Sequence, residues 1–243
     1  MVGQGTMPPA ILNPSADIRI CRHGREEQPT IVIDDMLTEP EQWRALARRV
    51  RYGQFGPFYP GLRSFVPQGA AIAMRNELEG VLAETFELDP VPPVFECYFS
   101  IVTTPPEELT PIQRLPHVDG VEADRIAILI YLSGATMGGT AFYRQRATGF
   151  ETLDEERYPL FDAALRAGIA EHGVPSPAYI SGDTILYEKI ASYEARPNRG
   201  IIYRSRALHC AEIPAGNPLP ANPVEGRLTI NSFLFDPPRL AGA

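Results

Sequence analysis

The sequence has few cysteines, few histidines and no excess of positive charge. Its 243 residues include three cysteines, an odd number without CxxC or zinc-site spacing, which predicts a reduced cytosolic protein. The 22 basic and 30 acidic residues give a formal net charge of −8. That balance lacks the electrostatic footprint of a protein that binds a nucleic-acid backbone, so we expect no nucleic-acid partner.

A long apolar run is also absent. The longest strongly apolar run, Ile126 to Leu132, is far shorter than the roughly 20 residues that a membrane-spanning helix needs. The first residues do not combine a basic region with a following apolar region, so we expect no signal peptide. These features predict a cytoplasmic protein without a membrane partner. The pattern does not indicate an oligomeric state.

Proline and glycine are abundant instead, and they separate short apolar segments. The 25 prolines and 20 glycines fall between segments rich in Val, Ile, Tyr, Phe and Thr, a pattern typical of many short strands joined by turns. Eight such strands with one long excursion predict a mainly β fold, a jelly roll. The expected strands are Val94–Thr103, Ile112–His117, Arg125–Leu132, Gly139–Arg144, Thr184–Glu194, Gly200–Arg204, Leu208–Ile213 and Arg227–Phe235.

Helices are expected before and beside this roll. Thr38–Glu41 reads as a capping box with proline in the first turn, and apolar residues at helical spacing follow it. A second helix is expected over Ala70–Phe86, and both should pack outside the roll. We expect one domain, residues 1–243. Its parts are an irregular lead-in (1–28), a helical flank (29–93) and a β core (94–236) with an insertion (145–182) that is either a lid or a packing element.

Two of the four histidines and one aspartate form the main candidate site. His117 and Asp119 are two residues apart in an extended segment, so both side chains point to the same side and can reach one cation. His209 lies in the seventh β segment, which neighbours the second in a jelly roll. Two imidazoles and one carboxylate on one face of an octahedral ion suit Fe(II) and leave three positions open.

Arg227 and Thr229 are the candidate cosubstrate residues. Arg227 opens the last β segment, where its guanidinium can hold a distal carboxylate through two parallel hydrogen bonds. Thr229 lies on the same face of that strand and can add a hydroxyl. A dicarboxylate that is held at one end and chelates iron at the other describes 2-oxoglutarate.

In these segments the sequence resembles the Fe(II)/2-oxoglutarate-dependent oxygenases, nearest the prolyl-4-hydroxylase-like branch. The resemblance covers about residues 94–236 and implies the double-stranded β-helix, the cupin-like jelly roll of that family. The matching motifs are LPHVDG at 115–120, IAILIYL at 126–132, MGGTAFYR at 137–144, RGIIYRSRALHCAE at 199–212 and GRLTINSFLF at 226–235.

The resemblance implies a function as well as a fold. It implies that His117, Asp119 and His209 ligate Fe(II) and that Arg227 binds 2-oxoglutarate. The implied reaction consumes O₂, converts 2-oxoglutarate to succinate and CO₂, and hydroxylates a small molecule or an amino-acid or peptide side chain. In the prolyl-4-hydroxylase-like branch the basic residue usually follows the second histidine more closely. We expect residues 213–226 to be an inserted loop for that reason.

Several alternatives stay open. Glu122 or Asp124 can replace Asp119 as the carboxylate ligand, although neither shares its spacing with His117. The chain can instead be a cupin-like metalloenzyme that does not use 2-oxoglutarate, or a non-catalytic jelly-roll binding module. Arg63, in an aromatic-rich loop, is expected to be a surface arginine, with contact to an anionic substrate as the alternative.

Overall fold

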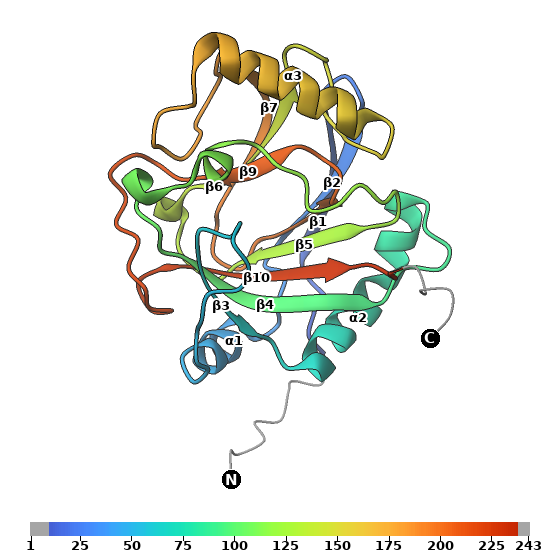
Figure 1. Cartoon of the computed structure of the whole chain (residues 1–243). Coiled ribbons are helices and arrows are strands. Elements are labelled where there is room, and N and C mark those ends of the chain that lie inside the picture. The colour runs from blue at the N-terminus through green and yellow to red at the C-terminus, as the bar shows by residue number, and fades with distance from the viewer. Residues whose placement is uncertain (1–9, 238–243) are drawn as a thin grey trace, which may run out of the picture.

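Two antiparallel sheets face each other in the computed structural model, which describes residues 10–237. Figure 1 shows the larger sheet below the smaller one. The larger sheet contains, in spatial order, β1 (Asp17–His23), β2 (Gln28–Asp34), β8 (Gly200–Arg204), β5 (Ile126–Tyr131), β10 (Arg227–Leu234), β4 (Val94–Val102) and β3 (Gly61–Phe65). The smaller sheet contains β7 (Tyr187–Glu194), β6 (Gly139–Gln145) and β9 (His209–Glu212).

The order of these strands is that of a double-stranded β-helix, as the sequence predicts. From β4 to β10 the chain crosses repeatedly between the sheets: β5, β8 and β10 join β4 in the larger sheet, while β6, β7 and β9 form the smaller one. His117 pairs with His209 in an isolated bridge and continues the smaller sheet beyond β9. The mainly β architecture with flanking helices is therefore correct.

The apolar run in β5 is explained by burial on both faces. All six residues of β5 are buried. Ile126, Ile128 and Ile130 point toward the helices that cover the outer face of the sheet, whereas Ala127 and Leu129 belong to the cluster between the sheets. A strand that is covered on both sides reads as a continuous apolar segment because neither set of alternating positions meets water.

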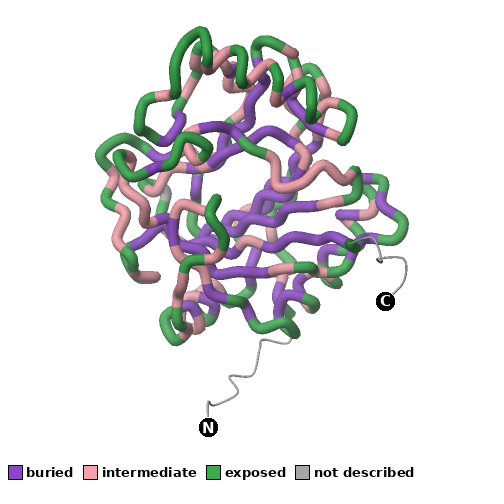
Figure 2. The backbone as a smooth tube through the Cα atoms, in the orientation of Figure 1, coloured by how far each residue is buried: buried purple, intermediate pink, exposed green. Residues whose placement is uncertain are grey.

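Three helices cover the outer faces, and Figure 2 shows their exposed sides turned to solvent. They are α1 (Pro40–Ala47), α2 (Gln68–Phe86) and α3 (Arg157–His172); the 3₁₀ helices are η1 (Pro106–Glu108), η2 (Pro111–Arg114) and η3 (Ala135–Met137). In α2 a stripe at four-residue spacing, Met74, Leu78, Leu82 and Phe86, is fully buried in the core shared with the larger sheet. Phe161 of α3 packs with the smaller sheet. None of the helices in residues 10–237 combines the length and apolarity needed to span a bilayer.

The Gly138–Gly139 pair explains part of the MGGT motif. Gly138 has φ +85°, a left-handed conformation, and a Cβ there would overlap the carbonyl oxygen of Glu212. A Cβ on Gly139 would overlap the carbonyl oxygen of Tyr193. Glycine is required at both positions because β6 begins in close contact with the backbones of β9 and β7.

Some expected elements differ in the structure. The strand expected over Ile112–His117 is wrong: residues 111–114 form η2, and only His117 pairs. The flanking prolines Pro111 and Pro116 lack the N–H groups that a strand ladder needs. The expected capping box is also wrong, because α1 begins after Glu39 and no side chain caps it.

The N-terminal segment contains strands that the sequence analysis does not predict. Residues 17–23, expected to be irregular, form the edge strand β1, while residues 1–9 of that segment lie outside the described residues. Residues 61–65, expected to be a loop, form β3. Five of the seven residues of β1 are exposed, so β1 lacks the alternation of buried and exposed positions that identifies a strand from sequence. The loop expected between β9 and β10 is present, over residues 213–226.

Candidate metal and cosubstrate site

Three side chains from two distant segments meet at the open end of the smaller sheet. His117 and His209 exchange both backbone hydrogen bonds, each with an N···O distance of 2.9 Å, and this bridge fixes their side chains beside each other. The N–H of Asp119 donates to the carbonyl of Ser205 (2.9 Å), which places the carboxylate next to both rings. The sequence predicts this convergence from the i, i+2 spacing and the strand order.

The donor atoms of this cluster lie within reach of one ion. One donor atom from each of His117, Asp119 and His209 lies within 4.8 Å of the others. The carboxylate of Asp119 is 3.3 Å from Nε2 of His209 and 3.8 Å from Nε2 of His117. Bonds of about 2.0–2.2 Å at right angles would put donor atoms about 3 Å apart, so only a small side-chain shift is needed. The donor set and its spacing fit a facially coordinated metal ion.

The ring of His209 is held in one orientation. Its Nδ1 lies 2.9 Å from the carbonyl oxygen of Ala207, which can only accept a hydrogen bond, so Nδ1 carries the proton. Nε2 is then free of a proton in the neutral ring and faces Asp119. A hydrogen bond of this kind to the second ring nitrogen is the usual way in which proteins orient a metal-ligating histidine.

The charges of the three groups are coupled. Burial opposes ionisation of Asp119, but the adjacent His209 and His117 outweigh it and lower the pKa of Asp119 to about 2. Burial, and after it the adjacent His209, lower the pKa of His117 to about 4. Burial also acts to lower the pKa of His209, yet Asp119 raises it above its ordinary value. At neutral pH Asp119 is a carboxylate and His117 is a neutral imidazole, as metal ligation requires.

A cavity of about 690 Å³ adjoins this cluster and is lined by residues of both sheets and of α3. Its volume lies within the range of about 300–1,000 Å³ for small-molecule sites. The side chain of His117 is 51% exposed although it lines this cavity, so its open side faces the space inside. The walls come from loop 53–60, from β4, β5 and β10, and from Tyr158, Phe161, Asp162 and Leu165 of the insertion helix α3.

Arg227 lines the same cavity and is almost completely buried (3% exposed). Its Nε donates to the carbonyl of Met137 (3.1 Å) and its Nη2 donates to the carbonyl of Gly139 (2.8 Å). No carboxylate among residues 10–237 forms an ion pair with it. Because a buried charge without a counter-ion is costly, this guanidinium is poised to receive an anion.

Thr229 lies beside Arg227 on β10 but does not line the cavity. It is fully buried, and its hydroxyl donates to Oδ1 of Asn231 (2.7 Å), which does line the cavity. Thr140 supplies a hydroxyl to the cavity instead and bonds to the hydroxyl of Tyr131 (2.7 Å), whose ring lies 5.6 Å from the Arg227 guanidinium. Neither Thr140 nor Tyr131 is among the site residues predicted from the sequence, although their positions in the MGGT and IAILIYL motifs gave a signal.

The fold is similar to several solved structures at low identity. The non-heme alpha-ketoglutarate-dependent epimerase SnoN from nogalamycin biosynthesis is 13% identical, with 87% of this chain and 79% of that chain covered and a TM-score of 0.48. HygX from Streptomyces hygroscopicus, solved with nickel and 2-oxoglutarate, is 12% identical, with 86% and 84% covered and a TM-score of 0.47. An N-substituted L-amino acid dioxygenase from Burkholderia ambifaria is 12% identical, with 90% and 94% covered and a TM-score of 0.42.

The sequence was compared with models of protein families and with curated proteins, and only a family model matches. No curated protein matches the chain. Residues 14–234 match DUF6445, described as a family of unknown function. The match spans almost all of the described residues, including both sheets and the His-Asp-His cluster. The chain therefore belongs to the DUF6445 family.

Proposed function

We propose that this protein is an Fe(II)- and 2-oxoglutarate-dependent oxygenase of the prolyl-4-hydroxylase-like branch, with His117, Asp119 and His209 as metal ligands. One observation carries the proposal: a buried guanidinium without a counter-ion, Arg227, shares a cavity with a His-Asp-His cluster. The cluster favours a metal with open positions, and the guanidinium favours an anionic cosubstrate that reaches toward it.

The residues of the chain have separate tasks in this proposal. When bound, Fe(II) supplies the chemistry by which O₂ oxidises 2-oxoglutarate to succinate and CO₂ and hydroxylates a substrate. Arg227 binds the distal carboxylate of 2-oxoglutarate, and Thr140 adds a hydroxyl at the same end. Thr229 supports that end through Asn231. The carbonyl of Ala207 keeps a proton on Nδ1 of His209 and so presents Nε2 to the metal.

The remaining parts of the proposal concern the setting of this chemistry. We propose one domain over residues 1–243, a cytoplasmic location, and a small-molecule, amino-acid or peptide substrate, with no nucleic-acid or membrane partner. A cavity of about 690 Å³ supports the choice of a small substrate or a single side chain.

Succinate release tests the function directly. The purified protein is given Fe(II), ascorbate, 2-oxoglutarate and O₂, and succinate is measured with and without candidate substrates. We expect slow release without substrate and no release from His209→Ala, which also loses iron. His172→Ala is the matched control, because His172 is an exposed histidine at the end of α3.

Other outcomes would favour the alternatives. Iron binding without succinate under any condition would indicate a non-catalytic binding module. Metal-dependent turnover of a substrate without consumption of 2-oxoglutarate would indicate a cupin-like metalloenzyme, and the role given to Arg227 would then be wrong.

A further inference from the structure

Arg63 lies in the cavity and not on the outer surface. It pairs with Ser100 of β4, and Tyr98 and Val102, which lie two residues to either side of Ser100 on the same face of that strand, line the cavity. That face lines the cavity, and Arg63 is among its lining residues. Its guanidinium carbon is 4.0 Å from the ring centroid of Tyr59 and 5.1 Å from that of Tyr98.

This guanidinium has stacking partners but no anionic partner. No carboxylate among the described residues lies within ion-pair distance of Arg63. Among the described residues, neither the buried Nε of Arg63 nor the buried hydroxyl of Tyr59 has a hydrogen-bond partner. By contrast Arg125, which lines the same cavity, pairs with Glu122 at 3.5 Å. A cation that is held between two rings and left with free donors is arranged to receive an anion from a ligand.

The two unpaired arginines of the cavity are placed for different groups. Arg227 is fixed by the backbone carbonyls of Met137 and Gly139, next to the start of β6. Arg63 lies on the edge strand β3, where its guanidinium lies against the rings of Tyr59 and Tyr98. Arg63 also closes the cavity-lining loop, since its backbone exchanges hydrogen bonds of 2.8 and 2.9 Å with Gly53.

We propose that Arg63 recognises an anionic group, a carboxylate or a phosphate, on the substrate itself. The donors of Arg63 and Tyr59 hold this group, and the apolar part of the substrate lies along Phe55 and Tyr98 toward the metal cluster. The assignment rests on the proposed function, in which Arg227 is occupied by 2-oxoglutarate. It restricts the substrate to organic acids or phosphate esters with an apolar body.

Binding of small anions tests the proposal without any turnover. The probes are 3-phenylpropionate, phenyl phosphate and the uncharged 3-phenylpropanamide, and their affinities are measured by calorimetry with metal-free protein. We expect one of the two anions to bind and the amide to bind at least about tenfold more weakly, because a charged hydrogen bond is lost. The preferred anion identifies the group as a carboxylate or a phosphate.

Variants locate the site of binding. We expect Arg63→Met to weaken anion binding about tenfold or more, and Arg63→Lys to recover part of the affinity because the charge is retained. Arg125→Gln is the matched control, since it removes a charge from the same cavity that is already paired with Glu122. Melting curves of each variant confirm that it is folded.

The outcomes separate this inference from the proposed function. Equal binding of anion and amide, no binding of either anion, or full affinity in Arg63→Met would overturn the role of Arg63. If Arg227→Met lost anion binding and Arg63→Met did not, the anion would bind at Arg227, and this result would also overturn the role of Arg63. Succinate release does not enter these measurements, so the oxygenase proposal can fail while the anion site stands, and the reverse.

Discussion

At the scale of single residues, the two histidines of the cluster have unequal surroundings. His209 is buried, donates from Nδ1 to a backbone carbonyl and faces Asp119, whereas His117 opens to the cavity. Asp119 raises the pKa of His209, while burial and His209 lower the pKa of His117 to about 4. The proton that competes with a metal ion is therefore the one on Nε2 of His209.

This difference predicts how metal binding depends on pH. Because His209 must lose a proton to ligate a metal, affinity should fall as the pH is lowered through its raised pKa, by about tenfold per pH unit below it. Calorimetric titration of the apoprotein with Ni(II) between pH 5.5 and 8 measures this. Affinity that stays constant over that range would contradict a role for the His209–Asp119 pair.

A second prediction concerns Arg227. Arg227→Met should weaken 2-oxoglutarate binding by about 10- to 100-fold, because charged hydrogen bonds to the distal carboxylate are lost. Metal content should stay close to that of the wild type, since Arg227 makes no contact with the His-Asp-His cluster. Arg227→Lys should bind with intermediate affinity because it keeps the charge but not the planar fork. Titration of 2-oxoglutarate into Ni(II)-loaded protein provides the measurement, and unchanged affinity would refute the role.

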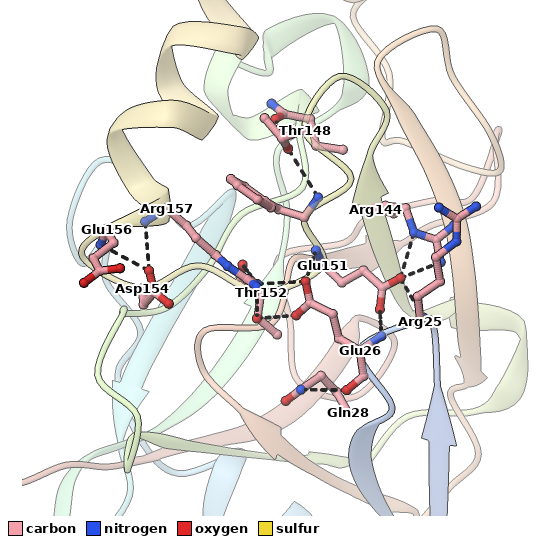
Figure 3. A network of polar contacts seen from close by, with 12 residues as sticks. Arg25, Glu26, Gln28, Arg144, Thr148, Glu151, Thr152, Asp154, Glu156 and Arg157 are labelled. Carbon is pink, nitrogen blue, oxygen red and sulfur yellow. Dashed lines mark hydrogen bonds and ion pairs between the residues drawn. The ribbon is translucent and has the colours of Figure 1, made fainter.

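At the scale of elements, a buried acid holds the turn between β1 and β2 against the insertion. Glu151 accepts the backbone N–H groups of Arg25 (2.9 Å) and Glu26 (3.0 Å), and Nε of Arg144 (2.7 Å), as Figure 3 shows. Glu26 in turn pairs with Arg157 at the start of α3 (2.8 Å). An exposed edge hairpin is thereby tied to the smaller sheet by polar contacts instead of by an apolar face.

Removal of this charge should destabilise the fold. Burial acts to raise the pKa of Glu151, but the N–H donors and Arg144 outweigh it and lower the pKa. A carboxyl group whose pKa is lower in the folded state than in the unfolded state stabilises the protein at pH values above the unfolded-state pKa. This stabilisation is lost as the pH falls through the folded-state pKa. Glu151→Gln should therefore lower the free energy of unfolding by about 3 kcal/mol near neutral pH, and by less below pH about 4.

Urea unfolding of matched variants measures this effect. Asp162→Asn, which removes a largely solvent-exposed ion pair with Arg166 one turn along α3, should change the free energy of unfolding by less than about 1 kcal/mol. Equal destabilisation by the two substitutions would contradict the holding role of Glu151.

Expected and observed elements differ where tertiary contacts outweigh local pattern. The strands β4, β5, β6, β8 and β10 follow from their content of Val, Ile, Tyr, Phe and Thr and from the turn residues that separate them. The edge strand β1 does not, because five of its seven residues stay exposed and its pairing depends on β2 and on the Glu151 contacts. Residues 111–114 carry apolar residues, yet the prolines remove strand hydrogen bonds and favour a 3₁₀ turn.

At the scale of the whole molecule, one cavity is lined both by the His-Asp-His cluster and by Arg227. His117, Asp119 and His209 belong to the edge of the smaller sheet, whereas Arg227 belongs to the larger one. In the proposed function, a cosubstrate bound at both ends would connect the two layers. Ligands that bind only the folded state increase its stability in proportion to the logarithm of their concentration.

This arrangement predicts a cooperative stabilisation. With Mn(II) and 2-oxoglutarate each at about 100 times their dissociation constants, each bound ligand should add about 2.7 kcal/mol, which corresponds to a rise in Tm of about 5–10 °C per ligand. In His209→Ala, 2-oxoglutarate should no longer raise Tm when Mn(II) is present. Differential scanning calorimetry measures both effects, and equal stabilisation of the variant would exclude a shared site.

The sequence by itself determined which residues are candidate metal ligands, their order along the chain and the faces on which their side chains lie. An i, i+2 spacing fixes the common direction of His117 and Asp119, and strand alternation fixes the inward face of Arg227. Only the tertiary structure decided that Thr140, not Thr229, lines the cavity, and that Arg63 lies inside it without an acidic partner. The physical reason is that the two-residue period of a strand fixes the direction in which each side chain points. The distances between side chains, and the pairing of their charges, depend on which distant segments of the chain become neighbours.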